Sequence, residues 1–235
     1  MDFDSYRKHY GKMMEERNNR PVPEFEGYSP SEMHRIFYFT FEPGSPIELN
    51  RLNDYDYEKI PIYNQIKYLL DLIEKKGELK LTDKGYLPPK IVTELYEQGF
   101  IKDPFIECGI VKMRREKDAM PVVLARILIE LSGLVKKRKG KLSLTNSSRK
   151  IVSDSHELFR SILTTFSTKF NWGYFDGYRS ENIGQKGFGF SLILLSKYGN
   201  KKRSASFYAE KYITAFPMLL NDIQSYKDDS IEDIK

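Results

Sequence analysis

One local pattern occurs twice in this 235-residue chain, and it constrains the fold more than any other feature. Residues 69–82 read LLDLIEKKGELKLT, and residues 131–145 read LSGLVKKRKGKLSLT. Each copy has the end of an apolar helix, a basic turn, a segment in which leucines alternate with polar residues, and a threonine. Alternation at period two indicates a strand with one buried face. The middle of the chain is therefore expected to repeat a helix-and-strand building block.

Apolar residues at helical spacing predict helices on both sides of these patterns. Ser29-Pro30-Ser31-Glu32 has the serine, proline and glutamate of a capping box, so it predicts a helix start. In the second copy, 134–137 and 141–145 can pair as a hairpin with Gly140 near its tip. The expected helices span 2–18, 62–74, 90–98, 121–131, 157–169, 190–197 and 204–224, the last of them bent at Pro217.

These elements predict an α+β protein that is predominantly α-helical, with two winged-helix-like units and a helical C-terminal region. The expected organisation is an N-terminal helical arm and linker at 1–28, a first unit at 29–103, a second at 104–153, and a helical region with an aromatic and glycine-rich segment at 154–235. The linkers between the units are short, so one compact body is expected.

The segment GLVKKRKGKLSLT, at 133–145, resembles the part of many winged-helix regulators where a helix is followed by a basic wing. In the DNA-binding members of that superfamily, the helix before the wing enters the major groove and wing cations contact phosphate. The resemblance implies nucleic-acid contacts at five cations of this hairpin: Lys136, Lys137, Arg138, Lys139 and Lys141. Cations on a protruding hairpin can displace counterions from a duplex, so such binding would depend on salt.

The helix before this hairpin fits that resemblance less well. Residues 121–132 read PVVLARILIELS and offer only Arg126, Glu130 and Ser132 as polar side chains. A helix that reads base edges presents arginine, lysine, asparagine or glutamine along one face. The alternative interpretation is a buried helix followed by a solvated basic turn.

A second candidate site is the aromatic and glycine-rich segment that follows residue 170. Trp172, Tyr174 and Tyr178 supply stacking faces and Asp176 a polar anchor, so a ligand pocket is one interpretation. The other is a loop that packs its own aromatic rings over the helical core.

The sequence contains no convergent catalytic or metal-binding signature. His9, His34 and His156 have no metal-ligand spacing, and Asp154, Ser155 and His156 are adjacent in a way that suits a helix cap better than a catalytic triad. We therefore expect no cofactor, no metal and no enzyme activity. With Cys108 as the only cysteine and no leader or membrane-spanning segment evident, a cytoplasmic protein without membrane contact is expected.

A wider resemblance runs from EGYSPSEMHRIFY at 26–38, through the two leucine–threonine patterns, to FNWGYFDGY at 170–178 and GFGFSLILLSKYG. These motifs resemble an uncharacterised family of bacterial proteins, some of which carry an additional cysteine-rich SEC-C motif. The resemblance implies no catalytic residues, and this chain lacks the cysteines of that motif.

Three functions remain open from the sequence. The first is a non-enzymatic binding protein, with double-stranded nucleic acid or a protein as its partner, acting as a regulator through the basic wing. The second is a protein-interaction or structural module without nucleic-acid binding, and the third is a small-molecule binder or enzyme that uses 171–190. The sequence fixes neither the partner nor the oligomeric state.

Overall fold

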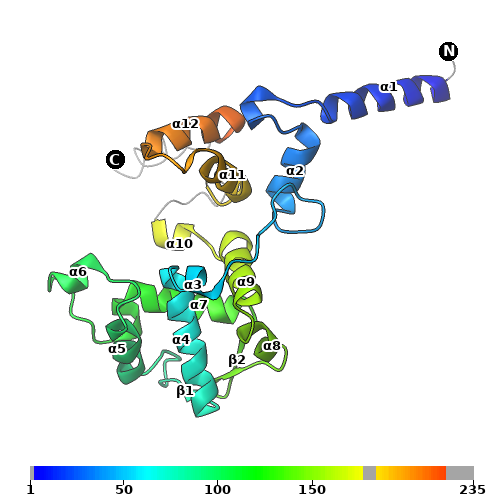
Figure 1. Cartoon of the computed structure of the whole chain (residues 1–235). Helices are drawn as coiled ribbons and strands as arrows, with labels where there is room; N and C mark the ends of the chain where they lie inside the picture. Colours follow the sequence, from blue (N-terminus) through cyan, green and yellow to red (C-terminus); the bar gives the residue numbers. More distant parts are fainter. Residues whose placement is uncertain (1–2, 177–183, 221–235) are drawn as a thin grey trace, which may run out of the picture. The chain divides into compact units, whose positions relative to one another are not determined.

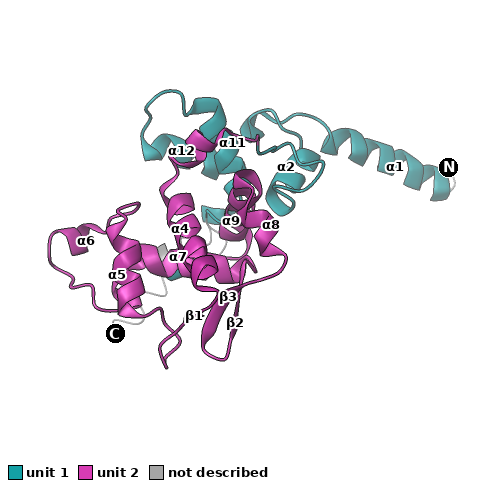
Figure 2. Cartoon of the chain, turned by 60° about the horizontal axis from the view of Figure 1, so that its bottom comes forward, with its two compact units in different colours: residues 1–49, 171–235 teal, residues 50–170 magenta. Residues whose placement is uncertain are grey.

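The computed structural model describes residues 3–176 and 184–220, which belong to two compact units (Figures 1 and 2). Unit 2 is continuous and spans 50–170, whereas unit 1 combines both ends of the chain, 1–49 and 171–235. Both units are mainly helical, and a small antiparallel sheet lies in unit 2. The predicted α+β class with a predominance of helix is confirmed. The predicted boundaries at 28, 103 and 153 do not coincide with the limits of these units.

Unit 2 contains helices and three short strands, with β1 between α4 and α5 and the pair β2 and β3 after α7. Its elements are α3 (Asp54–Tyr57), α4 (Pro61–Lys76), β1 (Leu79–Lys80), α5 (Pro89–Glu97), α6 (Pro104–Glu107), the 3-10 turn η2 (Glu116–Asp118), α7 (Met120–Leu131), β2 (Val135–Arg138), β3 (Lys141–Leu144), α8 (Ser148–Val152) and α9 (Ser155–Thr168).

The sheet of unit 2 joins the two copies of the repeated pattern. Its strand order is β1-β3-β2, and both pairs are antiparallel. Leu79 of the first copy lies opposite Leu142 of the second, and Val135 lies opposite Leu144. In the described part of the chain the two copies therefore share one sheet instead of each forming its own, because the two-residue strand β1 has its partner in the later hairpin.

The core of unit 2 forms where α4 and α7 pack against each other, with the inner face of the sheet beside them. The spacing of apolar residues in α4 directs one stripe inward, and Ile66, Leu69 and Ile73 are fully buried there. From α7, Val122, Ala125, Leu128 and Ile129 enter the same core. Full burial of an aliphatic side chain of this size contributes roughly 1.5–3 kcal/mol, so the α4–α7 contact is a major source of stability for this unit.

The β2–β3 hairpin turns through Lys139 and Gly140, whose φ angles are 48° and 70°. Two successive positive φ angles in a two-residue loop define a turn that matches the right-handed twist of the strands. No side chain lies near the position of a Cβ at Gly140, so the backbone conformation alone requires glycine there.

We expect Gly140→Ala to lower the free energy of unfolding of unit 2 by about 1 kcal/mol, because an L-residue is strained at this φ. Lys139→Asn is the matched variant and should leave stability unchanged or slightly higher, because asparagine tolerates positive φ. Urea unfolding followed by far-UV circular dichroism measures both. Equal stability of Gly140→Ala and the parent would contradict the strained turn.

Unit 1 is built from helices on either side of unit 2 in the sequence. Its elements are α1 (Phe3–Asn18), the 3-10 turn η1 (Pro23–Phe25), α2 (Pro30–Tyr38), α10 (Gly173–Asp176), α11 (Phe188–Tyr198) and α12 (Ala205–Ala215). The predicted start of α2 is confirmed, since Ser29 Oγ accepts from Glu32 N at 3.3 Å and Glu32 Oε2 accepts from Ser29 N at 2.8 Å.

The core of unit 1 packs α2 against α11, with α12 beside them. Ile36, Phe190 and Leu194 are almost completely buried in it, and Phe216 adds its ring 5.5 Å from that of Phe190. A Cβ at Gly189 would lie 2.7 Å from the Ile36 carbonyl oxygen, so this glycine permits the close approach of the two helices. Segments from opposite ends of the chain thus depend on one another for burial.

The predicted helix 204–224 is interrupted near Pro217: residues 219–220 are helical again, and 221–224 lie outside the described residues. Ser204 caps its start by accepting from Phe207 N at 3.3 Å, but α12 ends at Ala215. Phe216 leaves the helical region with φ −128° and ψ 62°, one residue before Pro217. A residue that precedes proline is disfavoured in the helical region, so the backbone leaves the helix at the position where the bend at Pro217 was predicted.

Candidate nucleic-acid interface on the three-stranded sheet

Figure 2 shows the three strands β1, β2 and β3 of unit 2, and their register places cations from all three strands on the outer face of the sheet. Directly paired residues of neighbouring strands point to the same face, and side chains alternate along each strand. Lys141 is paired with Lys80 on one side and with Arg138 on the other. Lys136, two residues before Arg138, points to this face as well. We call Lys80, Lys136, Arg138 and Lys141 the basic face; all four are exposed.

The inner face explains why these cations point outward. Leu79, Val135 and Leu142 are buried and hold the sheet against the helices. In ELKL (78–81) and KLSL (141–144) leucines alternate with polar residues. Burial of the leucines therefore directs Lys80 of β1 and Lys141 of β3 to the outer face.

Two of the five cations predicted from the sequence lie outside the basic face. Lys137 is paired with the buried Leu142, so it belongs to the inner side, and its Nζ would lie 2.8 Å from a Cβ at Gly85. Lys139 is in the turn at the exposed tip of the hairpin. Lys136, Arg138 and Lys141 do share a face, and Lys80 joins them.

One carboxylate lies beside the basic face. Glu78 Oε2 accepts from Lys141 Nζ at 2.5 Å. The hydrogen bond from Lys141, with Coulomb attraction by Lys141 and Lys136, holds the pKa of Glu78 below its usual value. Both partners are about half exposed, so the pair is a surface ion pair of small net energy. Glu78 neutralises one of the four cations and leaves the rest open to solvent.

The helix before the hairpin has no polar face for reading bases. Half of the residues of α7 are buried, and the Arg126 side chain is only 14% exposed. Its Nε donates to Glu116 Oε1, and its Nη1 donates to Glu130 Oε1 at 2.6 Å. Glu116 also accepts from the backbone N–H of Leu87 at 2.5 Å. Arg126 is therefore a structural cation, which agrees with the buried-helix interpretation of this segment.

The aromatic segment is described only in part. The Trp172 ring meets the edge of Phe188 with centroids 5.6 Å apart, and the backbone N–H of Trp172 donates to Gln185 Oε1 at 3.3 Å. The side chain of Tyr174 is 62% exposed. Tyr178 and the side chain of Asp176 lie outside the described residues. The predicted pocket at these positions stays a prediction.

The start of α9 is held by hydrogen bonds that involve Asp154 and His156. Asp154 Oδ1 accepts from the backbone N–H groups of His156 and Glu157 and so caps the helix. Both carboxylate oxygens of Asp154 also accept from Arg51, and Tyr57 Oη lies 3.0 Å from His156 Nδ1. These bonds attach α3 and the segment before it to α9, as the capping interpretation expects.

Within 3–176 and 184–220, no group of three histidine, cysteine, aspartate or glutamate side chains could hold a metal ion. No helix in those ranges has the length and apolar character needed to cross a membrane.

The stretch of the chain that is similar to a known family falls on the unit that carries the basic face. Residues 58–158 match the family described as the Y4jL N-terminal domain, which is uncharacterised. Neither the curated proteins nor the solved structures contain a match to the chain. Helix α4, the hairpin and all four residues of the basic face lie within the stretch that is similar to this family.

Proposed function

We propose that the protein is a non-enzymatic, cytoplasmic nucleic-acid-associated regulator that attaches to the backbone of a duplex through the basic face of unit 2. The observation that carries the proposal is the convergence of Lys80, Lys136, Arg138 and Lys141 on one exposed face, with Lys139 at the hairpin tip. Lysine and arginine side chains that line a surface displace condensed counterions from phosphates. Because the sheet already holds these cations in place, no segment of the chain has to become ordered when the duplex binds.

The order of elements in unit 2 also supports this proposal. A helix, a strand, two further helices and a hairpin follow one another as α4, β1, α5, α7 and β2–β3, with the short turns α6 and η2 in between. The sheet order β1-β3-β2 fits a single winged-helix-like unit in which β2–β3 is the wing. We therefore propose that the winged-helix resemblance drawn from 133–145 applies to unit 2 as a whole, with both copies of the repeated pattern contributing to one sheet.

The burial of α7 indicates contacts to phosphates and not to base edges. Phosphate contacts position a protein on a duplex, and base contacts give sequence preference. Because Arg126 is engaged with Glu116 and Glu130, α7 offers no arginine to base edges. We therefore propose binding that depends strongly on salt and weakly on sequence.

The test is fluorescence anisotropy of the full chain with labelled duplexes of about 20 base pairs and unrelated sequences. Neutralising Lys80, Lys136 and Arg138 together, as K80Q/K136Q/R138Q, should weaken binding at 50 mM salt at least tenfold. It should also reduce the slope of log K against log salt by about 3, because each phosphate contact contributes about 0.9. All three side chains are exposed, so the fold should be unaffected.

Two matched variants make this test specific. K90Q/K112Q/K117Q removes the same charge from exposed lysines of unit 2 outside the sheet and should leave binding within about twofold. Glu78→Gln frees Lys141 and should tighten binding. No binding by the parent chain at 50 mM salt, or an equal loss in both triple variants, would rule out the basic face as the interface.

A further inference from the structure

Helix α1 has an apolar face with no partner in the described structure. None of its residues is buried, although Phe3, Tyr6, Tyr10 and Met13 follow one another at spacings of three, four and three. These spacings place all four on one side of the helix, and each is more than half exposed. An isolated helix of this length is marginal in water, so it gains stability when the face is covered. On a helical projection, Arg7 borders this face and Arg17 continues it.

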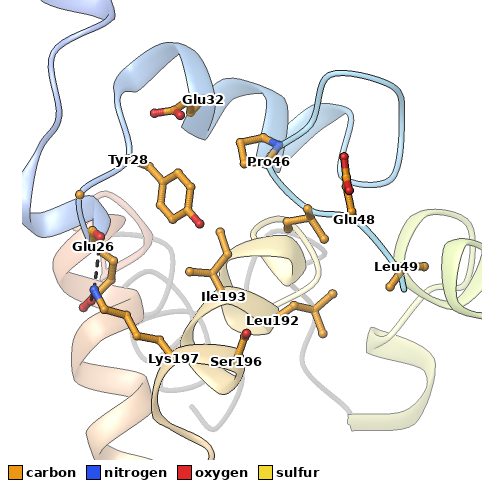
Figure 3. A pocket seen from close by; sticks show the side chains of 12 residues that line it. Glu26, Tyr28, Glu32, Pro46, Glu48, Leu49, Leu192, Ile193, Ser196 and Lys197 are labelled. Carbon is orange, nitrogen blue, oxygen red and sulfur yellow. Dashed lines mark hydrogen bonds and ion pairs between the residues drawn. The ribbon is translucent and has the colours of Figure 1, made fainter. Parts of the chain in front are cut away.

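Unit 1 also contains a groove of about 590 Å³ that α1 does not fill (Figure 3). The groove is bounded by the loop before α2, by the segment 46–49 and by one side of α11. Its apolar lining is supplied by Tyr28, Pro46, Ile47, Leu49, Leu192 and Ile193. A volume of this size accommodates a few large side chains.

The polar rim of the groove is acidic where it is open. Figure 3 shows Glu32 at the top and Glu48 at the right of the groove, and Glu26 joined to Lys197 at its left. Among the described lining residues the cation is Lys197, which donates to Glu26 at 2.7 Å. Lys211 donates to the same carboxylate, so the acidic part of the rim is the part formed by Glu32 and Glu48. Glu48 is exposed, and Glu32 caps α2. An apolar helix face bordered by cations therefore complements this groove in both shape and charge.

The connection between α1 and the groove favours a helix from another molecule. The loop after the arm is tied down, because Val22 N donates to Tyr28 O at 3.0 Å and Gly27 N donates to Val22 O at 3.1 Å. Pro21 and Pro23 fix their own φ angles, and Val22 between them is extended, with φ −117° and ψ 124°. This stiff exit opposes a sharp reversal of α1 onto its own groove, whereas a second copy has no such restriction.

We propose that two copies of the chain exchange their α1 helices, each inserting its aromatic face into the groove of unit 1 in the other. Because the exchange is symmetric, the same contact between α1 and a groove forms twice. Both grooves are then filled, so the assembly stops at a dimer. Phe3, Tyr6 and Tyr10 enter the apolar lining, and Arg7 and Arg17 approach Glu48 and Glu32. This proposal concerns unit 1 only and is independent of the basic face in unit 2.

The experiment is sedimentation equilibrium of the full chain between 1 and about 100 μM, with charge-reversal variants of arm and groove. In R7E/R17E an acidic α1 faces the unchanged acidic groove. In E48R the unchanged basic α1 faces a groove that has lost an acidic residue and gained a basic one. Each variant alone should dimerise at least tenfold more weakly than the parent, because like charges across an interface are unfavourable. A mixture of the two variants should recover the dimer, since both of its arm–groove contacts then pair opposite charges.

An apolar variant tests the other half of the contact. Y6S/Y10S should weaken the dimer at least tenfold while circular dichroism shows an intact fold, because neither ring is buried in the monomer. A parent chain that is monomeric at 100 μM would overturn the proposal, whether α1 is free or folded onto its own groove. A dimer unaffected by E48R would overturn it too, because direct pairing of two α1 helices does not involve Glu48.

Discussion

Replacing Arg126 by methionine is expected to destabilise unit 2 by about 3–5 kcal/mol, which is the usual cost of removing one partner of a buried ion pair. Glu116 is 1% exposed and has two described donors, Arg126 and the Leu87 backbone N–H. Without the guanidinium, the carboxylate stays out of contact with water and lacks a compensating charge. The loss should appear as a lower urea midpoint by far-UV circular dichroism at pH 7.

A double variant separates the ion pair from simple packing. R126M/E116Q removes both charges, retains an acceptor for Leu87 N and fills a similar volume, so we expect it to recover most of the lost stability. Glu130, which is 31% exposed, can be solvated after the change. An R126M chain within 1 kcal/mol of the parent would contradict the view that Arg126 compensates the buried carboxylate.

The second large effect is expected at Glu26 in unit 1. Its side chain is 9% exposed and accepts from Lys197, from Lys211 at 2.5 Å and from Tyr198 Oη at 2.6 Å. Burial alone would raise the pKa of Glu26, but the hydrogen bonds from these three groups and the Coulomb attraction of Lys197 outweigh it. They lower the pKa from 4.5 to about 2.

The direction of the pH dependence follows from this shift. A carboxyl whose pKa is lower in the folded state contributes stability above its unfolded pKa and loses that contribution as the pH falls. Glu26 should therefore stabilise unit 1 fully above about pH 4.5, and the contribution should disappear as the pH approaches 2. The shift corresponds to about 3 kcal/mol.

The measurement compares Glu26→Gln with the parent chain in urea at several pH values. Trp172 is the only tryptophan and belongs to unit 1, so its fluorescence follows this unit. The difference in stability should be largest near pH 7 and should vanish near pH 2. A difference that is constant across this range would show that the carboxylate charge of Glu26 has no part in it. The subtraction removes the titration of other acids, such as Asp154 and Asp118, whose pKa values are also lowered.

The helices and the hairpin could be predicted because their signals are local. Apolar spacing marks α4, the Ser29–Glu32 capping box marks the start of α2, and leucine alternation around Gly140 marks the hairpin. The pairing of β1 with β3 could not be predicted in this way, because Leu79 and Leu142 are far apart in the sequence and each pattern is complete by itself. That pairing is what merges two apparent repeats into one sheet.

The same reasoning applies to the candidate site. Lys136, Arg138 and Lys141 were evident as a charge cluster, but Lys80 was not, since its neighbours in the sequence include Glu78. Only the register of three strands brings Lys80 beside Lys141 and turns Lys137 away. The Glu26 network was invisible for a similar reason, because its lysines come from helices more than 170 residues away along the chain. An isolated glutamate in a sequence gives no indication of such partners.

Because unit 1 needs both ends of the chain, its assembly on the ribosome must wait for synthesis to be nearly complete. Unit 2 is continuous and can fold as it emerges, while the nascent α2 helix holds Met33 and Ile36 without Phe190 and Leu194 to cover them. At roughly 5–20 residues per second, synthesis of the intervening residues takes about ten seconds or more. During that interval the apolar side chains of α2 remain uncovered, and a prematurely terminated chain would keep them exposed although unit 2 is complete.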